Sequence, residues 1–197
     1  MTTATKITLS RIAFIPVVVA VYLLNFPGHR MLAGVLFAIA ALSDLIDGYV
    51  ARKYNQVSDL GKFLDPIADK MLVVVFMFLF VADNLIFNPW GAIVCGVVLS
   101  REFMISAFRM QAAVKKIVIP ADVWGKLKTD FQDVGSAVII FASDPIFLSH
   151  GDGAAMVGKV LMYIGLVAFF IGAALAVYSG VNYIVKNKNV FTQKEEA

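Results

Sequence analysis

Four aspartates at fixed intervals carry the chemistry that this sequence is best equipped to do. Asp44 and Asp47 are three residues apart, and Asp65 and Asp69 are four apart. Side chains at these spacings share one face of a helix, so each pair presents two carboxylates together. Clustered carboxylates suit hard cations such as Mg2+, Mn2+ or Ca2+. Two such cations held about 4 Å apart stabilise the attacking and leaving oxygens of a phosphoryl displacement. The spacing therefore predicts a divalent-metal site for chemistry at phosphorus.

The residues between the two acidic pairs strengthen this interpretation. A lone pair of acidic residues near a helix end is most often solvated, but that explanation does not account for four at these spacings. Gly48 and Ala51 share the helix face of Asp44 and Asp47 and leave room for a flat ring or another backbone. Arg52 follows Gly48 by one turn and can hold a phosphate with two parallel N–H bonds.

The elements that must position these carboxylates are membrane helices. The chain has 197 residues, of which 60% are hydrophobic and 16% charged, with a mean hydropathy of +0.81. Soluble domains are about half apolar and a quarter charged, and one core in a chain of this size cannot bury the excess. We expect an all-α polytopic membrane protein with six transmembrane helices. The apolar segments are 12–26, 31–50, 71–82, 90–108, 131–148 and 157–185.

Two of these segments need comment. The third is short only because Asp65 and Asp69 stand where its helix should begin. The first is not expected to be a cleaved signal peptide, because it lacks a small-residue cleavage site and contains Pro16. No internal repeat or linker is visible, so we expect a single domain over residues 1–197.

Basic residues are distributed unevenly between the two sides of the predicted membrane. Of the 17 lysines and arginines, only Arg30 and Lys159 fall outside the termini and the second-to-third and fourth-to-fifth connections. The positive-inside rule then places both termini, those connections and the aspartates at the cytoplasmic face. The net charge of +3 is accounted for in this way, and we expect membrane lipid but no nucleic acid as a partner.

The complete pattern is that of a known family. Asp44-x2-Asp47-Gly48-x2-Ala51-Arg52-x8-Gly61-x3-Asp65-x3-Asp69 resembles, at every defined position, the motif of the CDP-alcohol phosphotransferase family. The resemblance implies transfer of a phosphatidyl-type group from a CDP-linked lipid to an alcohol, with release of CMP. It also implies two divalent cations, Mg2+ or Mn2+, a homodimer and a bacterial cell membrane.

The resemblance also implies residue roles. Asp44, Asp47 and Asp65 would bind the metals, and Asp69 would be the general base and a further metal ligand. Thr8 and Arg11, before the first span, resemble an N-terminal element that approaches the nucleotide, although Thr5 stands where the family often has Asn. Arg11 could equally be an inside-positive anchor. The residues expected at the CDP-lipid are Thr8, Arg11, Gly48, Ala51, Arg52 and Gly61.

A second basic group indicates the acceptor. Arg101 and Arg109 are eight residues apart, so one side of a helix faces both, and Lys126 opens the fifth helix on the same face of the membrane. A cationic pocket beside a metal site suits an acceptor that carries its own phosphate. These segments resemble the Arg-Glu and Gly-Lys-x-Lys-Thr-x-x-Gln elements of phosphatidylglycerophosphate synthases. We expect CDP-diacylglycerol and sn-glycerol 3-phosphate as substrates, with Arg101, Arg109, Lys126 and Lys128 at the acceptor.

Other interpretations remain open at this point. The four basic residues could be ordinary inside-positive charges, with Arg101 paired to Glu102 or Asp130. The acceptor could be inositol phosphate or phosphatidylglycerol. A cation channel or transporter is a different class, but it predicts aspartates spread over several helices and repeated halves. Four glycines near one side of the last helix indicate close packing and suggest a subunit interface. They are Gly158, Gly165, Gly172 and Gly180.

Overall fold

The long helices predicted from the sequence are present. The computed structural model describes the backbone of residues 3–54, 59–114 and 123–187, and the side chains of residues 9–43, 70–112 and 123–187. This described part is helical and contains no strand. Its helices are α1 (Thr3–Leu23), α2 (His29–Tyr54), α3 (Asp59–Ala82), α4 (Trp90–Val114), α5 (Val123–Ala142), α6 (Ile146–Ser149) and α7 (Gly151–Lys186).

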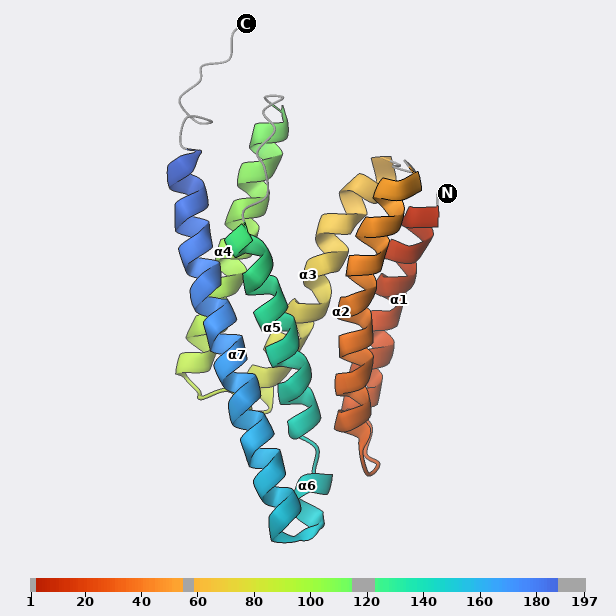
Figure 1. The fold of residues 1–197 in the computed structure, drawn as a ribbon, viewed down its shortest axis with the longest axis vertical. Coiled ribbons are helices and arrows are strands. Elements are labelled where there is room, and N and C mark those ends of the chain that lie inside the picture. The colour runs from red at the N-terminus through yellow and green to blue at the C-terminus, as the bar shows by residue number, and fades with distance from the viewer. Residues whose placement is uncertain (1–2, 55–58, 115–122, 188–197) are drawn as a thin grey trace, which may run out of the picture.

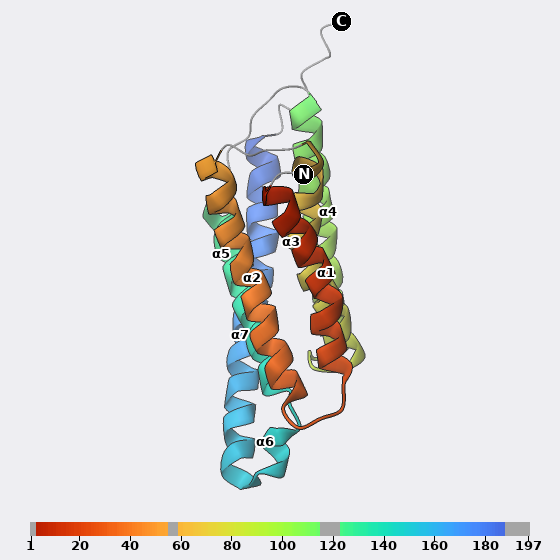
Figure 2. The same cartoon turned by 90° about the vertical axis from the view of Figure 1, so that its right-hand side faces the viewer.

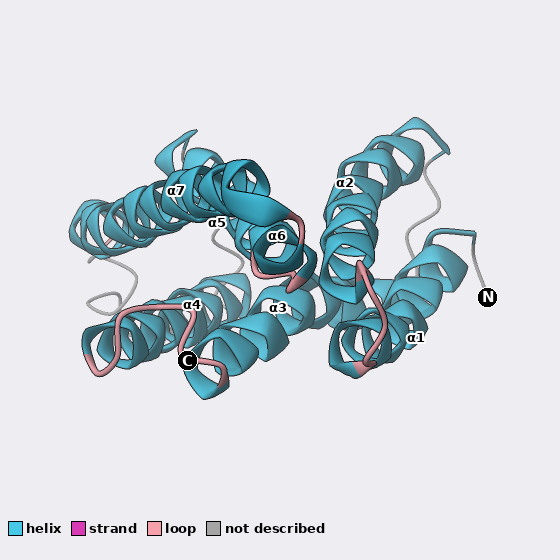
Figure 3. Ribbon diagram, turned by 90° about the horizontal axis from the view of Figure 1, so that it is seen from below, coloured by secondary structure: helices cyan, strands magenta, loops and turns pink. Residues whose placement is uncertain are grey.

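The long helices run roughly along one axis. The start of α1 and the end of α7 lie at the same end of the molecule (Figures 1 and 2). Seen along the bundle, the helices form two rows, α7–α5–α2 and α4–α3–α1 (Figure 3). Among the described residues, α2 packs mainly on α1 and α5 and touches α3 only slightly. In this view α2 and α3 stand in different rows (Figure 3).

Two helices of the described part are long and apolar enough to cross a membrane. They are residues Trp90–Ala112 of α4 and the whole of α7, with mean hydropathies of 1.6 and 2.5. At a rise of 1.5 Å per residue, the 36 residues of α7 extend about 54 Å, against roughly 30 Å for the hydrocarbon core. Shorter apolar stretches lie in α1, α2 and α3. The chain is a membrane protein.

Aromatic side chains fill the space between the two rows. Phe76 of α3 is fully buried and meets the rings of Tyr22 and Phe37 edge-on, at centroid distances of 5.7 and 5.1 Å. One turn further along, Phe80 packs edge-on against Phe169 of α7 at 6.0 Å. Edge-to-face contacts are favoured geometries for aromatic pairs. One face of α3 is therefore the centre of the bundle, whereas Phe78 on another face is 63% exposed and available to lipid.

Glycines bring α5 and α7 into backbone contact. A Cβ at Gly135 would lie 2.5 Å from the backbone nitrogen of Phe169, and one at Gly165 would lie 2.9 Å from the backbone nitrogen of Ile139. Gly172 similarly faces Gln132. The close packing expected for the last helix is confirmed. For Gly165 and Gly172 it occurs within the chain, because both face α5, while the suggestion of a subunit interface stays a prediction.

A polar clasp joins four helices at the end of the molecule opposite the termini. The Arg30 guanidinium donates to the Asp83 carboxylate at 2.6 Å, and the Tyr22 hydroxyl donates to the same oxygen at 2.7 Å. Asp144, between α5 and α6, accepts the backbone N–H groups of Arg30 and Met31 at 2.8 and 3.1 Å. A carboxylate from elsewhere in the chain therefore caps the start of α2.

Three helix limits can be compared with the sequence predictions. The expectation that the third helix begins before its apolar stretch is confirmed, because α3 starts at Asp59. The fifth segment was wrongly extended to residue 148, since α5 ends at Ala142 and Asp144-Pro145 turns the chain into the short α6. The last helix begins at Gly151, six residues before the predicted start.

Candidate active site

A polar cavity of about 520 Å3 lies among α1, α2, α3, α4 and α5. One part of its lining is apolar and includes Leu72, Met77 and Val98. Its remaining wall is strongly charged. The basic side chains of its described lining are Arg11, Lys70, Arg101, Arg109, Lys126 and Lys128. The acidic side chains of that lining are Glu102, Asp130 and Asp133. Six positive and three negative side chains leave an excess of three positive charges, which suits an anionic ligand.

The helices bring these basic residues together as the sequence predicted. Arg101 and Arg109 lie two turns apart on α4, and Lys126 and Lys128 lie in the first turns of α5. All four line the cavity, as does the buried Arg11 of α1. Arg109 also rests on the ring of Tyr183, with its guanidinium carbon 5.4 Å from the centroid. The predicted grouping of these side chains is therefore confirmed, while their roles toward a ligand stay predictions.

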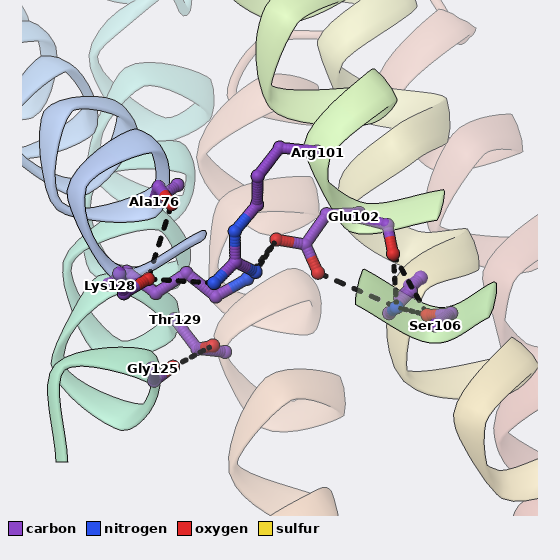
Figure 4. Close-up of polar contacts among 9 residues, drawn as sticks. Arg101, Glu102, Ser106, Gly125, Lys128, Thr129 and Ala176 are labelled. Atoms are coloured by element: carbon purple, nitrogen blue, oxygen red, sulfur yellow. Dashed lines mark hydrogen bonds and ion pairs between the residues drawn. The ribbon is translucent and has the colours of Figure 1, made fainter. Parts of the chain in front are cut away.

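Glu102 is the point where the cations of the cavity meet. Its carboxylate pairs with Arg101 at 2.7 Å, with Lys128 through a short contact, and with Lys70 at 3.5 Å (Figure 4). The three cations come from α4, α5 and α3. All four side chains are largely buried, with exposed fractions between 8% and 30%. The pairing of Arg101 with Glu102, raised as an alternative to ligand binding, is present.

This pairing does not neutralise the cluster formed by Glu102 and its three cations. Three cations around one carboxylate carry two net positive charges in a site that is largely removed from water. Buried charges that are not balanced cost free energy, so a dianion entering beside them would be favoured. A phosphate monoester carries between one and two negative charges near neutral pH. The arrangement can therefore hold the cations in place and still attract a phosphate.

Helix α7 helps to fix the Arg101 side chain. The Arg101 guanidinium donates to the hydroxyl of Ser179 on α7 at 2.7 Å. Ser179 in turn donates to the backbone oxygen of Ala176 at 3.2 Å (Figure 4). A Cβ at Gly180 would lie 2.8 Å from Cγ of Arg101 and 2.9 Å from its Nε. The absence of a side chain at Gly180 therefore leaves the space through which Arg101 reaches the cavity.

The four aspartates lie on the helices that border this cavity. Asp44 and Asp47 are in the last turns of α2, and Asp65 and Asp69 are in the first turns of α3. Both segments lie toward the end of the molecule that carries the termini (Figure 1). Cavity residues adjoin them in sequence, because Ala41 precedes Asp44 by three positions and Lys70 directly follows Asp69.

The side chains of residues 44–69 lie outside the described part of the chain. That region includes every predicted metal ligand and the nucleotide residues Gly48, Ala51, Arg52 and Gly61. The side chain of Thr8 lies outside it as well. An all-carboxylate donor set fits Mg2+ or Mn2+, which prefer oxygen ligands. The sequence and the backbone positions thus fit a divalent-metal site, whose geometry stays a prediction.

Two residues of the site were not singled out from the sequence. Lys70 was grouped with the inside-positive charges, although its place directly after Asp69 was a usable signal. Glu102 was considered only as a partner for Arg101, yet it contacts three cations. A carboxylate between two arginines on one helix could have indicated such a role. Gln132, the last residue of the Gly-Lys-x-Lys-Thr-x-x-Gln element, is buried and lines the cavity.

Comparison with known proteins gives a consistent result. The profile of the family described as CDP-alcohol phosphatidyltransferase matches residues 1–174. A protein of Rickettsia bellii is 35% identical over 187 residues, covering 94% of each chain. One of Bacillus subtilis is 34% identical over 194 residues, covering 92% of this chain and 93% of the relative. One of Salmonella typhimurium is 33% identical over 182 residues, covering 91% of each. All three are named CDP-diacylglycerol–glycerol-3-phosphate 3-phosphatidyltransferase.

Proposed function

Because this chain belongs to the CDP-alcohol phosphatidyltransferase family, we propose that it transfers the phosphatidyl group of CDP-diacylglycerol to sn-glycerol 3-phosphate. The products are phosphatidylglycerophosphate and CMP, and the reaction belongs to phospholipid biosynthesis. The observation that carries the acceptor is the cationic cavity beside the aspartate-bearing helices. Its described lining has three more positive than negative side chains, and glycerol 3-phosphate brings a phosphate into it.

The carboxylates supply the catalytic half of the site. Asp44, Asp47, Asp65 and Asp69 would hold two divalent cations. When bound, those cations would withdraw charge from the diphosphate and make CMP a better leaving group. Asp69 accepts the proton of the acceptor's primary hydroxyl as that oxygen attacks the phosphorus of the phosphatidyl group. The bond from that phosphorus to the CMP oxygen breaks, and CMP leaves with the electron pair.

Residues near the aspartates bind the CDP-lipid. Gly48, Ala51 and Gly61 leave room for the cytidine, and Arg52 pairs with a phosphate. Thr8 and Arg11 approach the nucleotide from α1. Support for Arg11 comes from its buried side chain in the lining of the cavity.

Residues of α4 and α5 bind the phosphate of the acceptor. Arg101 and Lys128 are the inner cations, since Lys128 is buried, the Arg101 side chain is only 13% exposed, and both are held by Glu102. Arg109 and Lys126 contribute from the rest of the lining. Holding the phosphate away from the aspartates leaves the hydroxyl end of the acceptor free to approach Asp69. Positioning of this kind supplies a large part of the acceleration when the chemical groups are only modest bases.

The same proposal extends to the placement of the protein in its membrane. Six helices would span a bacterial cell membrane as one domain over residues 1–197, with both termini and the active site at the cytoplasmic face. The asymmetric distribution of Lys and Arg supports this orientation. A homodimer is the expected assembly, because the family resemblance implies one.

A comparison of acceptors tests the proposed function. Purified protein in detergent would receive CDP-diacylglycerol, Mg2+ or Mn2+, and one acceptor at a time, with CMP release measured. We expect release that requires both the metal and glycerol 3-phosphate. Release with inositol phosphate or phosphatidylglycerol in its place would keep the four aspartates and contradict the assignment of the cationic cavity. No release with any acceptor would contradict the transferase itself.

A further inference from the structure

Lys70 connects the helix of the catalytic aspartates to the helix of the acceptor cavity. Its ammonium group contacts the Glu102 carboxylate at 3.5 Å, donates to the Glu102 backbone oxygen at 3.1 Å, and makes a short contact with the Ser106 hydroxyl. All three partners lie within one turn of α4 (Figure 4). Lys70 itself directly follows Asp69 on α3. One side chain thus ties the position next to the proposed base to a single turn of the neighbouring helix.

That turn of α4 is also connected to the proposed phosphate-binding cations. Glu102 contacts Arg101 of its own helix and Lys128 of α5, and Ser106 donates to the Glu102 backbone oxygen at 2.9 Å. A continuous series of polar contacts therefore runs from Lys128 and Arg101 through Glu102 to Lys70. Packing between α3 and α4 is sparse among the described residues compared with the packing of α5 on α7. Among the described residues, the contacts of Lys70 are therefore a large share of what fixes α3 against α4.

We infer that Lys70 and Glu102 are positioning residues that hold the aspartate end of α3 in register with the acceptor's phosphate site. The inference rests on the proposed function; it assigns Lys70 a role there and extends the role of Glu102, which so far only holds Arg101 and Lys128. Neither residue reacts in this account. Glu102 orients Arg101 and Lys128 for the phosphate, and Lys70 transmits that arrangement to the backbone beside Asp69.

The two residues should affect different kinetic constants. Loss of Lys70 leaves Arg101 and Lys128 on Glu102, so phosphate binding persists while the base is displaced. Loss of the Glu102 charge disturbs the phosphate site and removes the ion pair with Lys70. Misplacement of a reacting group by about 1 Å costs on the order of 100-fold in rate. We call the contacts of Lys70 with Glu102 and Ser106 the bridge. The bridge predicts a lower kcat for Lys70 variants, and both a lower kcat and a higher KM for glycerol 3-phosphate for Glu102 variants.

Four variants test this separation in the full-length protein in detergent. Lys70→Met should lower kcat by about 10- to 100-fold and change KM for glycerol 3-phosphate by less than about 3-fold. Glu102→Gln should raise that KM by about 10-fold and also lower kcat. Lys70→Arg should recover most of the lost kcat, because a guanidinium can reach Glu102 and Ser106. In the double variant Lys70→Met/Glu102→Gln, the losses in kcat should be less than multiplicative.

The matched control is Asp83→Asn at the opposite end of α3. Asp83 joins α3 to Arg30 of α2 at 2.6 Å, so it also ties two helices together through an ion pair. We expect this variant to lose thermal stability with kcat and KM unchanged. An equal fall in kcat for Asp83→Asn would mean that loosening α3 anywhere has the same effect, and the bridge would be refuted.

Other results would also overturn the inference. A wild-type kcat in Lys70→Met would show that α3 does not need the contact. A raised KM with unchanged kcat would make Lys70 a ligand of the phosphate. Either result with active wild-type protein contradicts the bridge and leaves the proposed function intact. Absence of turnover by the wild-type protein with glycerol 3-phosphate would overturn the proposed function and the bridge together.

Discussion

The role of each charged side chain in this site depends on the charges around it. A carboxylate in a cavity that must bind an anion would ordinarily weaken binding. Glu102 contacts Arg101, Lys128 and Lys70, so it stabilises three cations that would otherwise repel one another in a buried position. The remaining excess of positive charge is available to the ligand. In the proposed function, Glu102 would therefore organise the anion site even though its charge is opposite to that of the residues proposed to bind the anion.

The first prediction concerns the metal ligands. Asp44→Asn and Asp65→Asn should each reduce CMP release to background, because a neutral amide is a poor ligand for Mg2+ or Mn2+. Both variants should remain inserted and folded, since the substitution keeps the size of the side chain. Rates would be measured beside circular dichroism and size-exclusion profiles. A folded variant that turns over at the wild-type rate would exclude that aspartate from the metal site.

The second prediction separates the roles of the carboxylates. Asp69→Asn should abolish turnover and still bind CDP-diacylglycerol, because the amide cannot accept the acceptor's proton while the other three aspartates remain. Equilibrium binding of the CDP-lipid in the presence of metal would be compared with that of Asp44→Asn. Equal loss of binding in both variants would identify Asp69 as chiefly a metal ligand.

Sequence patterns predicted the residues of the cavity better than their connections. Arg101, Arg109, Lys126 and Lys128 were expected together, and all line one cavity, because helical spacing and the side of the membrane fix where they stand. The convergence of three helices on Glu102 was not predicted. It depends on how α3, α4 and α5 pack, and no spacing within one helix encodes a contact between helices.

At the scale of elements, backbone contact between α5 and α7 is the tightest packing described. Gly135 faces the backbone of α7, and Gly165 faces that of α5. Without side chains at these positions the helices approach closely, as small residues permit in membrane bundles. This contact also supports the cationic cavity, because Gln132 and Lys128, which line it, lie on the side of α5 that faces Gly172.

The third prediction tests this contact. Gly135→Ala should lower the stability of the protein by about 1–3 kcal/mol, because the added Cβ would lie 2.5 Å from a backbone nitrogen of α7. Gly96→Ala is the matched control, since a Cβ there meets nothing within 4 Å. Thermal unfolding in detergent would compare the two. Equal melting temperatures would contradict the close approach of α5 and α7.

The fourth prediction concerns the cap on α2. Asp144→Ala should lower stability by about 1 kcal/mol, because Asp144 accepts the N–H groups of Arg30 and Met31. Kinetic constants should not change, since Asp144 lies at the end away from the cavity. Asp152→Ala is a useful comparison, because Asp152 is an exposed acidic residue in the first turn of α7. An equal or larger loss for Asp152→Ala would contradict the role of Asp144.

The contribution of Asp144 should also depend on pH. Burial opposes its ionisation, but the backbone N–H groups of Ile146, Met31 and Arg30 outweigh burial and hold its pKa below the usual 3.8. A lowered folded-state pKa stabilises the protein fully above the ordinary value, and this stabilisation is lost as pH falls through the folded-state pKa. The difference in melting temperature between wild type and Asp144→Ala should stay constant from pH 8 to about 5. It should shrink below pH 3.8.

Helix ends show what local sequence can predict. Apolar length indicated six long helices, and the described part contains them. The fifth was extended too far because 146–149 is apolar like the residues before it. Asp144 and Pro145 end α5, and the carboxylate of Asp144 caps α2. That cap lies 114 residues away in sequence from Arg30, so no local pattern could have revealed it.

At the scale of the whole molecule, charge and polarity divide the bundle into two ends. The end of α2, the start of α3, the start of α1 and the end of α7 lie toward one end (Figure 1). The cationic cavity is lined by Lys70 near the start of α3 and by Lys126 and Lys128 near the start of α5. The other end carries short loops (Figure 3) and the clasp formed by Arg30, Asp83 and Tyr22. Substrates with charged head groups would therefore meet the site from one side of the membrane.

The fifth prediction tests that orientation. Ser149 and Lys186 are exposed; Ser149 ends α6, just before α7 begins, and Lys186 is the last residue of α7. The only natural cysteine, Cys95, is buried. In a Cys95→Ser background, Lys186→Cys should react with a membrane-impermeant thiol reagent only after cells are opened. Ser149→Cys should react in intact cells. The reverse pattern would place the active site at the outer face.

The most direct test of the account is transfer of label from radioactive glycerol 3-phosphate into lipid. Purified protein would be supplied with CDP-diacylglycerol and Mg2+, with a chelator in one sample and metal restored in another. We predict that the label enters phosphatidylglycerophosphate in proportion to the CMP released. The label should be absent with chelator, return with metal, and be absent in Asp44→Asn. CMP release without label in lipid, or transfer that continues at the same rate with the chelator present, would contradict the proposed reaction.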